Sequence, residues 1–306
     1  MKKSEISLCE WHAVIDVLSG ANCISLKNER YRASILREPP DSGELDNPYL
    51  YGMPILFPVN RIDGGSFEFE GRKYSFPINE PSTGCHLHGD LHRMDFEVSE
   101  QSDSKIVCRY KANSCEYLGF PHAFEITQEY ELKEDGFYHT VTVRNLSSEN
   151  MPVFLGFHTT FNTLFTENSH RENIRVYADI TEEYERNIEI NYLPTGVMPD
   201  FDNVSASLAG GTYKPFEGKT SRHYRGQGKM SITDLKSGLR VVYDNDEKYG
   251  FRLIFNGGDE GYICLEPQTC LANCQNAPFP RSESGFDYIS PRASKTYNSR
   301  IYLEEI

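Results

Sequence analysis

Three of the nine histidines in the chain lie within one short segment, "GCHLHGDLH", at residues 84–92. His86 and His88 are two positions apart, so their side chains share a face in an extended segment, and His92 or Cys85 could join them. Such a set could bind a metal ion, act as a proton donor or acceptor, or consist of polar loop residues. A zinc site needs three or four converging ligands, and the chain has no C-x-x-C or H-E-x-x-H motif to supply them. We therefore predict no metal site, and the other two interpretations stay open.

Two distant segments each place one titratable side chain among apolar residues. His158 lies between phenylalanines in "FLGFHTTFN", and Glu266 follows Ile263 and Leu265 in "GYICLEPQT". Apolar surroundings raise the pKa of a carboxyl, which is one way in which enzymes make a general base that titrates near neutral pH. A hydrogen-bonded core histidine and a solvated glutamate at a strand end are the alternatives for these two residues.

The elements that position these residues are predicted to be short strands, because apolar residues alternate along the chain. In "FYHTVTVRN", residues 137–145, Phe137, His139, Val141 and Val143 share one face. The preceding "ITQEYELKEDG" ends in an Asp-Gly turn signal, so the two segments predict a hairpin.

Further strand patterns occur along the rest of the chain. "SFEFEGRKYSF", residues 66–76, predicts two strands that turn at Gly71, and "SGLRVVYDNDEKYGFRLIF", residues 237–255, predicts two more that pair with each other. The C-terminal "YNSRIYLEEI" places Tyr297, Ile301 and Leu303 on one face. No segment has a sustained helical stripe with caps, and we interpret the Gly- and Ser-rich residues 203–215 as a long loop. The predicted fold class is all-β, a large antiparallel β-sandwich, with residues 1–306 in a single domain.

The charge of the chain limits its partners. Its formal net charge is −14, which repels nucleic acid and anionic lipid and suits neutral or cationic ligands better. The N-terminal residues are interrupted by charges and do not resemble a signal peptide, and the eight scattered cysteines are expected to be reduced thiols of a cytoplasmic protein. "RGQGK", residues 225–229, lacks the spacing of a phosphate loop and precedes a strand, and no G-x-S-x-G motif of a hydrolase occurs.

A set of motifs in a fixed order carries a more specific resemblance. "MPILFPVNRIDGGSFEFEGRKYSFPINE" is followed by "LHG", "GFHTTFN", "PTG" at residues 194–196 and "CLEPQTCLANCQNA". Together they resemble the aldose 1-epimerase (galactose mutarotase) family over essentially the whole chain. The resemblance implies a β-sandwich that binds a monosaccharide and interconverts its α and β anomers through the open-chain aldehyde without a cofactor.

The resemblance also implies roles for individual residues. Glu266 of "LEPQT" resembles the base of the family and His158 its acid. His88 of "LHG" resembles the second histidine, which hydrogen-bonds near the ring oxygen. Arg61 and Asn60 of "VNRI" resemble residues that hold sugar hydroxyls, although Arg61 could equally be a structural ion-pair partner. His86 and His92 are then loop residues without a catalytic role.

The chain departs from the family pattern in two places. The family commonly reads His-Pro-Tyr-Phe-Asn where this chain reads "HTTFN", and a sugar-binding Asp downstream of "PTG" has no clear counterpart in residues 214–230. Arg222, His223 or Arg225 could stand near that position, so the identity of the sugar stays open. We expect an epimerase of a free aldose that is a monomer or a homodimer. The alternatives are a non-catalytic carbohydrate-binding protein on the same scaffold and a hexose-6-phosphate 1-epimerase.

Overall fold

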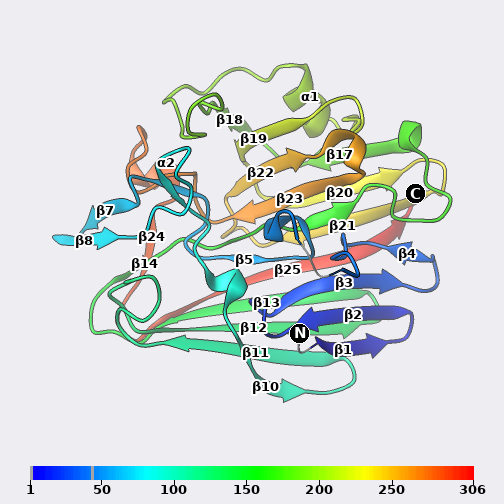
Figure 1. Cartoon of the computed structure of the whole chain (residues 1–306). Coiled ribbons are helices and arrows are strands. Elements are labelled where there is room, and N and C mark those ends of the chain that lie inside the picture. Colours follow the sequence, from blue (N-terminus) through cyan, green and yellow to red (C-terminus); the bar gives the residue numbers. More distant parts are fainter. Residues whose placement is uncertain (1–2, 43–44) are drawn as a thin grey trace.

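Antiparallel strands make up most of the regular structure in the computed structural model, which describes residues 3–42 and 45–306 (Figure 1). In the first half of the chain they are β1 (Lys3–Leu8), β2 (Trp11–Asp16), β3 (Asn22–Asn28), β4 (Ala33–Ser34), β5 (Ile55–Leu56), β6 (Arg61–Asp63), β7 (Ser66–Phe69), β8 (Arg72–Ser75), β9 (Cys85–Leu87), β10 (Glu97–Gln101), β11 (Lys105–Ala112), β12 (Phe124–Lys133) and β13 (Gly136–Asn145). In the second half they are β14 (Met151–Val153), β15 (Gly156–Phe157), β16 (Thr160–Asn162), β17 (Ile174–Ala178), β18 (Glu182–Tyr184), β19 (Thr220–Arg225), β20 (Gly228–Asp234), β21 (Leu239–Asn245), β22 (Phe251–Asn256), β23 (Tyr262–Gln268), β24 (Asp287–Ile289) and β25 (Ser294–Glu305).

Helices are few and short in these residues. They are the α-helices α1 (Asn203–Ala209) and α2 (Arg281–Ser284) and the 3-10 helices η1 (Pro48–Leu50), η2 (Leu91–Arg93), η3 (Arg171–Asn173) and η4 (Gly258–Glu260). None of the helices in the described ranges has the length and apolar character that a membrane span requires.

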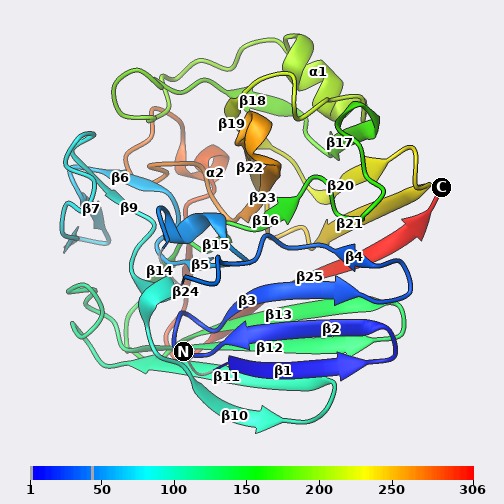
Figure 2. The ribbon, with the colours of Figure 1, turned by 45° about the vertical axis from the view of Figure 1, so that its right-hand side comes forward.

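Two layers of sheet form the body of the molecule. One layer is an eight-stranded sheet in the order β10-β11-β12-β13-β25-β21-β20-β17, in which β25 lies between β13 and β21. The other layer combines the four-stranded sheet β1-β2-β3-β4 with a seven-stranded sheet in the order β18-β19-β22-β23-β15-β5, where β16 also pairs with β23. Figures 1 and 2 both show β1–β3 lying across β11–β13.

Buried contacts join the two layers. The Tyr130 hydroxyl on β12 donates to the Ala21 carbonyl at 2.8 Å, and the Phe161 ring on β16 packs on Tyr243 of β21 with ring centres 5.5 Å apart. The core between the layers is rich in fully buried aromatic and aliphatic side chains. The predicted antiparallel β-sandwich is therefore confirmed.

Most of the predicted strands are also confirmed. β12 and β13 form the expected hairpin, and the burial of β13 alternates as its sequence predicts. β7 and β8 pair across the turn at Gly71. On β25, Tyr297 and Ile301 are buried and Leu303 packs against the core.

Two sequence predictions about elements are wrong. The strands β21 and β22 do not pair with each other, because β21 belongs to the eight-stranded sheet and β22 to the seven-stranded one. Their connection contains Tyr249, which is buried at 1% exposure, so it packs into the core as the chain passes from one sheet to the other. Residues 203–209 of the predicted loop form α1, whose N-terminus is capped by the Asp202 carboxylate through the backbone N–H groups of Val204 and Ser205. A helix of seven residues is too short to show a helical apolar period in the sequence.

Candidate active site

A cavity of about 270 Å³ opens on one face of the seven-stranded sheet. Its walls combine side chains from β19, β22 and β23 with residues of the connecting segments. The lining residues are Asn47, Tyr49, Leu50, Asn60, Arg61, Glu80, Leu87, His88, His158, Arg186, Tyr192, Ser221, Leu253, Phe255 and Glu266. All five residues that the sequence nominated for the site therefore line one pocket.

Glu266 lies in the middle of β23, opposite Leu253 of β22, and is fully buried. Burial raises the pKa of its carboxyl to about 8, because the charged form loses its hydration. The side-chain amide of Gln268 donates to Glu266 Oε2 at 3.0 Å and opposes this rise. Glu266 Oε1 makes no hydrogen bond with any described residue and is left for another partner.

His158 lies between β15 and β16 and directs its Nε2 atom at Glu266 Oε1, at a distance of 3.3 Å. Its backbone N–H donates to the Pro54 carbonyl, which fixes the chain at this point. Burial lowers the pKa of the imidazole to about 4, so His158 is uncharged near neutral pH. Between these two pKa values, Glu266 and His158 share one titratable proton. This proton is additional to the N–H that a neutral imidazole always carries.

His88 is held by reciprocal contacts with Asn60. The His88 N–H donates to the Asn60 carbonyl at 3.1 Å, and the Asn60 N–H donates to His88 Nδ1 at 3.2 Å. Both residues have a positive φ, 61° and 63°, and the left-handed backbone is uncommon for a histidine. Because Nδ1 accepts a hydrogen bond and burial keeps the pKa of the ring well below its usual value, the neutral ring carries its proton on Nε2. His88 is therefore a hydrogen-bond donor at that atom.

Asn60 and Arg61 are engaged in interactions within the protein. The Asn60 side-chain amide donates to Gln268 Oε1 at 3.1 Å, so Asn60 orients the glutamine that binds Glu266. The Arg61 guanidinium forms two hydrogen bonds with the Glu80 carboxylate, at 2.6 and 2.7 Å, and lies over the Tyr192 ring. A direct role of either residue in binding sugar hydroxyls stays a prediction.

Comparisons with known proteins give the same assignment over most of the chain. The sequence model of the aldose 1-epimerase family matches residues 12–286. The chain belongs to this family. Among solved structures, a galactose mutarotase-like protein from Clostridium acetobutylicum is 29% identical and has a TM-score of 0.91, with 100% of this chain and 98% of that chain covered.

More distant structures share the family fold. A galactose mutarotase-like protein from Lactobacillus casei is 19% identical with a TM-score of 0.76, and covers 99% of this chain and 100% of that one. Among curated proteins of Escherichia coli K12, the uncharacterised protein YphB is 28% identical over 108 residues, which are 35% of this chain and 36% of YphB. The uncharacterised protein YihR is 27% identical over 151 residues, 49% of this chain and 46% of YihR. The matches thus span less than half the length of either curated relative.

The family motif "LHG" accounts for His88, and the structure places the other two histidines of the cluster elsewhere. His86 lies in strand β9 and not in a loop, with its Nδ1 hydrogen-bonded to the Pro77 carbonyl. His92 lies in η2, where its Nε2 accepts a hydrogen bond from Arg93 Nε. Among the residues that the structure describes, no group of three or more His, Cys, Asp or Glu side chains is arranged to hold a metal ion.

The sequence did not indicate Tyr49, which packs among the histidines. Its ring centre is 4.8 Å from that of His88, 4.7 Å from that of His92 and 6.0 Å from that of His158. Tyr49 therefore has His92 and the two nominated catalytic histidines as close ring neighbours. Its only local signal is the preceding Asn47-Pro48, where the Asn47 side chain caps η1.

The residues proposed to replace the sugar-binding Asp of the family do not line the cavity. Arg222 binds Glu183 at 3.0 Å and Asp202 at 2.7 Å, and Arg225 binds Glu182 at 2.8 Å. His223 is fully buried. Strand alternation turns Arg222 away from its neighbour Ser221, which does line the cavity. His223 and Arg225 share the face of Ser221, but His223 is covered and Arg225 is bound to Glu182 and to the Glu283 carbonyl. Neither Arg222 nor Arg225 is therefore in the cavity, where the hexose-6-phosphate alternative would need a cation.

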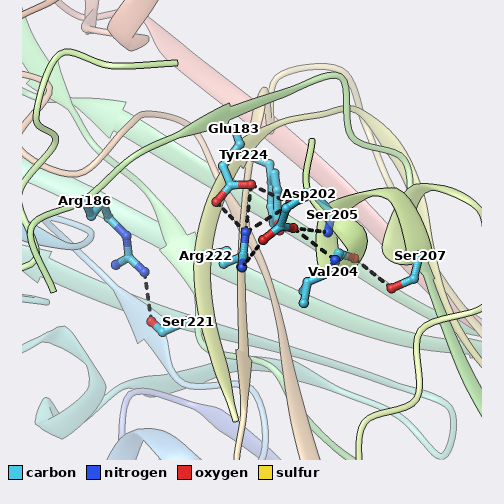
Figure 3. Close-up of polar contacts among 9 residues, drawn as sticks. All are labelled: Glu183, Arg186, Asp202, Val204, Ser205, Ser207, Ser221, Arg222 and Tyr224. Carbon is cyan, nitrogen blue, oxygen red and sulfur yellow. Dashed lines mark hydrogen bonds and ion pairs between the residues drawn. The ribbon is translucent and has the colours of Figure 1, made fainter. Parts of the chain in front are cut away.

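The arginine that does line this part of the cavity is Arg186, which the sequence did not indicate. It follows β18 at the edge of the seven-stranded sheet, and its Nη2 donates to the Ser221 hydroxyl at 2.8 Å. Figure 3 shows the Arg186 guanidinium at Ser221, apart from the cluster of carboxylates around Arg222. Glu182, Tyr184 and Arg186 alternate along the chain, so their side chains point to the same face of the sheet. Only the order of the strands shows that this is the face on which Glu266 lies.

Proposed function

We propose that the protein is an aldose 1-epimerase, a mutarotase that interconverts the α and β anomers of a free aldose. The observation that supports it most is the 3.3 Å approach of His158 Nε2 to Glu266 Oε1 in a cavity of about 270 Å³. A base and an acid side by side suit a reaction in which one proton leaves the substrate and another is added at a neighbouring atom.

The reaction follows from these groups. When the proton that Glu266 and His158 share lies on His158, the Glu266 carboxylate removes the proton of the anomeric hydroxyl and His158 gives its proton to the ring oxygen. The bond between C1 and the ring oxygen breaks, and C1 becomes an aldehyde. Rotation about the C1–C2 bond presents the other face of the aldehyde, and reclosure returns both protons to their donors.

His88 assists at the ring oxygen. Its Nε2–H is a fixed donor because Asn60 occupies Nδ1. A hydrogen bond from this atom stabilises the negative charge that grows on the ring oxygen as the bond breaks. The reaction needs no cofactor, because no electrons are transferred and the substrate supplies its own leaving group.

The test uses freshly dissolved pure anomers of common hexoses and pentoses, followed by polarimetry or NMR with and without protein. At least one aldose is expected to equilibrate faster with protein. No acceleration for any sugar in the panel would contradict the proposal. Binding of a sugar without acceleration would favour the carbohydrate-binding alternative.

The substitution Glu266→Gln distinguishes an epimerase from a carbohydrate-binding protein. The amide keeps the size of the side chain but cannot accept the proton, so kcat over background should fall by roughly 10²- to 10⁴-fold while sugar affinity changes much less. The matched control is Glu183→Gln, which changes a buried glutamate of β18 that binds Arg222 outside the cavity. The control should keep its kcat. A Glu266→Gln variant that binds poorly but turns over normally at saturation would overturn the role of Glu266.

A further inference from the structure

The charges in the cavity do not balance. Arg61 and Glu80 neutralise each other through two short hydrogen bonds. The other Arg and Glu residues that line the cavity are Arg186 and Glu266. Because the pKa of Glu266 is raised to about 8, its carboxyl is mostly protonated at neutral pH and does not cancel the charge of Arg186.

Arg186 is nine-tenths buried, with 7% of its surface exposed. Within residues 3–42 and 45–306, no carboxylate lies within ion-pair distance of its guanidinium, and its one side-chain hydrogen bond goes to the neutral Ser221 hydroxyl. Burial, followed by the nearby Arg61, lowers the pKa of Arg186 to about 10, which still leaves it charged at neutral pH. A guanidinium has five N–H donors, so most of its donors have no partner in the described protein.

Another buried arginine of the same sheet shows what a structural guanidinium looks like in this fold. Arg252 on β22 is fully buried and donates to the carbonyls of Tyr249, Phe251 and Gly228, at 2.6, 3.0 and 3.2 Å. Both of its terminal nitrogens thus bind backbone carbonyls, while its Nε has no partner among the described residues. Arg186 differs because its unused donors border a cavity that also contains the proposed catalytic groups.

The position of Arg186 is fixed by strand pairing. Tyr184 of β18 pairs with His223 of β19, so Arg186, two residues later, lies beside Ser221, two residues earlier. The segment that follows returns Tyr192 to the cavity, where its ring lies 4.4 Å from the Arg61 guanidinium. Arg186 is thereby held between the sheet and this segment at one wall of the cavity.

We propose that Arg186 binds a singly charged acidic substituent of the substrate, so that the enzyme acts on acidic aldoses, of which the hexuronates are the simplest. The inference rests on the proposed epimerase function and names its substrate class. A carboxylate accepts two parallel, charge-assisted hydrogen bonds from a guanidinium, and neutral sugar hydroxyls lack the negative charge that strengthens these bonds.

The net charge of the chain opposes the binding of any anion, and it opposes a phosphate ester more than a monoanion. A phosphate monoester carries about 1.5 to 2 negative charges at neutral pH, and the chain has a net charge of −14, which repels a dianion more strongly. In the described lining, only one guanidinium lacks a carboxylate partner. One such cation matches one carboxylate.

The experiment compares D-galacturonate and D-glucuronate with their parent hexoses, D-galactose and D-glucose, and with D-glucose 6-phosphate. Anomer exchange is measured by NMR for the full chain and for Arg186→Met, Arg186→Lys and Arg222→Met. Arg222→Met is the matched control, because it removes one positive charge on the other face of β19 where Glu183 and Asp202 bind it. Equilibrium binding of the same sugars to Glu266→Gln, by calorimetry, measures recognition without turnover.

The unaltered chain should process at least one uronate with a kcat/KM at least tenfold above that of its parent hexose. Arg186→Met should reduce this preference about 10- to 100-fold, mainly through KM, as expected for a lost hydrogen-bonded ion pair. Arg186→Lys should restore part of it, and Arg222→Met should leave it unchanged. Added salt should weaken uronate binding more than hexose binding.

Three results would overturn the inference. They are equal or better use of the parent hexoses, a preference for the 6-phosphate over both uronates, and equal losses for uronates and hexoses in Arg186→Met. The last result would mean that Arg186 acts only on the pKa of Glu266. If no sugar is turned over at all, the proposed function fails, and the binding measurements still decide whether Arg186 selects an acidic sugar.

Discussion

Arg222 and Arg186 lie on opposite sides of the sheet edge formed by β18 and β19, and their surroundings differ (Figure 3). Arg222 binds two carboxylates, Glu183 and Asp202, and also donates to the Ser205 hydroxyl. Arg186 donates to one hydroxyl and faces a cavity. A buried ion with all its partners in the protein contributes to the fold, whereas one that lacks them is costly unless a ligand completes it. The difference teaches that the partners of an arginine distinguish a structural residue from a candidate binding residue.

Substitutions of the cavity residues are expected to have their largest effect on turnover. His158→Gln is expected to reduce kcat by roughly 10²- to 10⁴-fold, since it removes the proton donor of the proposed reaction. Combining it with Glu266→Gln should cost less than the sum of the two losses, because both groups serve one concerted step. Steady-state and single-turnover anomer exchange of the three variants measures this. Fully additive losses would mean that the two groups act in separate steps.

Substitution of Arg222 is expected to affect the stability of the fold instead. Arg222→Met leaves Glu183 as a buried carboxylate without its cation, which should lower the free energy of unfolding by about 2 to 4 kcal/mol. The kcat of the folded fraction should not change. Urea unfolding followed by tryptophan fluorescence or circular dichroism gives the first quantity, and anomer exchange the second. A large fall in kcat with an unchanged free energy of unfolding would contradict the assignment of Arg222 to stability and of the cavity residues to turnover.

The pH dependence of turnover tests the pairing of Glu266 with His158. Below about pH 4 both groups are protonated and the base is lost, and above about pH 8 the shared proton is absent and the acid is lost. After subtraction of the uncatalysed rate, kcat/KM should therefore form a plateau between these values and fall about tenfold per pH unit outside them. A rate that keeps rising above pH 9 would show that the carboxylate alone carries the reaction.

Metal removal should have the smallest effect. Prolonged treatment with a chelator is expected to leave turnover and thermal unfolding unchanged, since His86, His88 and His92 each make a different contact and do not converge. Elemental analysis of the purified protein is the accompanying measurement. Stoichiometric zinc that is lost together with activity would refute this prediction.

The sequence was sufficient to predict the strands and the motif residues. Period-two alternation located the β12–β13 hairpin, and short motifs located His88, His158 and Glu266, which all line one cavity. Both kinds of pattern depend on neighbouring residues alone, and the catalytic roles of the three motif residues stay a prediction.

The sequence could not predict contacts that depend on the order of strands in a sheet. The pairing of β21 with β22 was predicted from their proximity in the chain, yet each strand lies in a different sheet. Arg186 and Tyr49 were missed for the same reason, because their neighbours in space are far away in the sequence. Arg222 lies within residues 214–230, where the family pattern places its Asp, whereas Arg186 lies outside that segment and reaches the cavity only through the pairing of β18 with β19.

The place of β25 in the larger sheet affects how the chain folds during synthesis. This strand, Ser294–Glu305, lies between β13 and β21, and its residue Tyr297 pairs with Val141. Until β25 leaves the ribosome, β13 and β21 each have an unpaired edge, although all the residues that line the cavity have already been made. Open edges of this kind recruit other strands, and pairings between distant residues form slowly. The nascent chain is therefore expected to expose two open strand edges until β25 pairs with both.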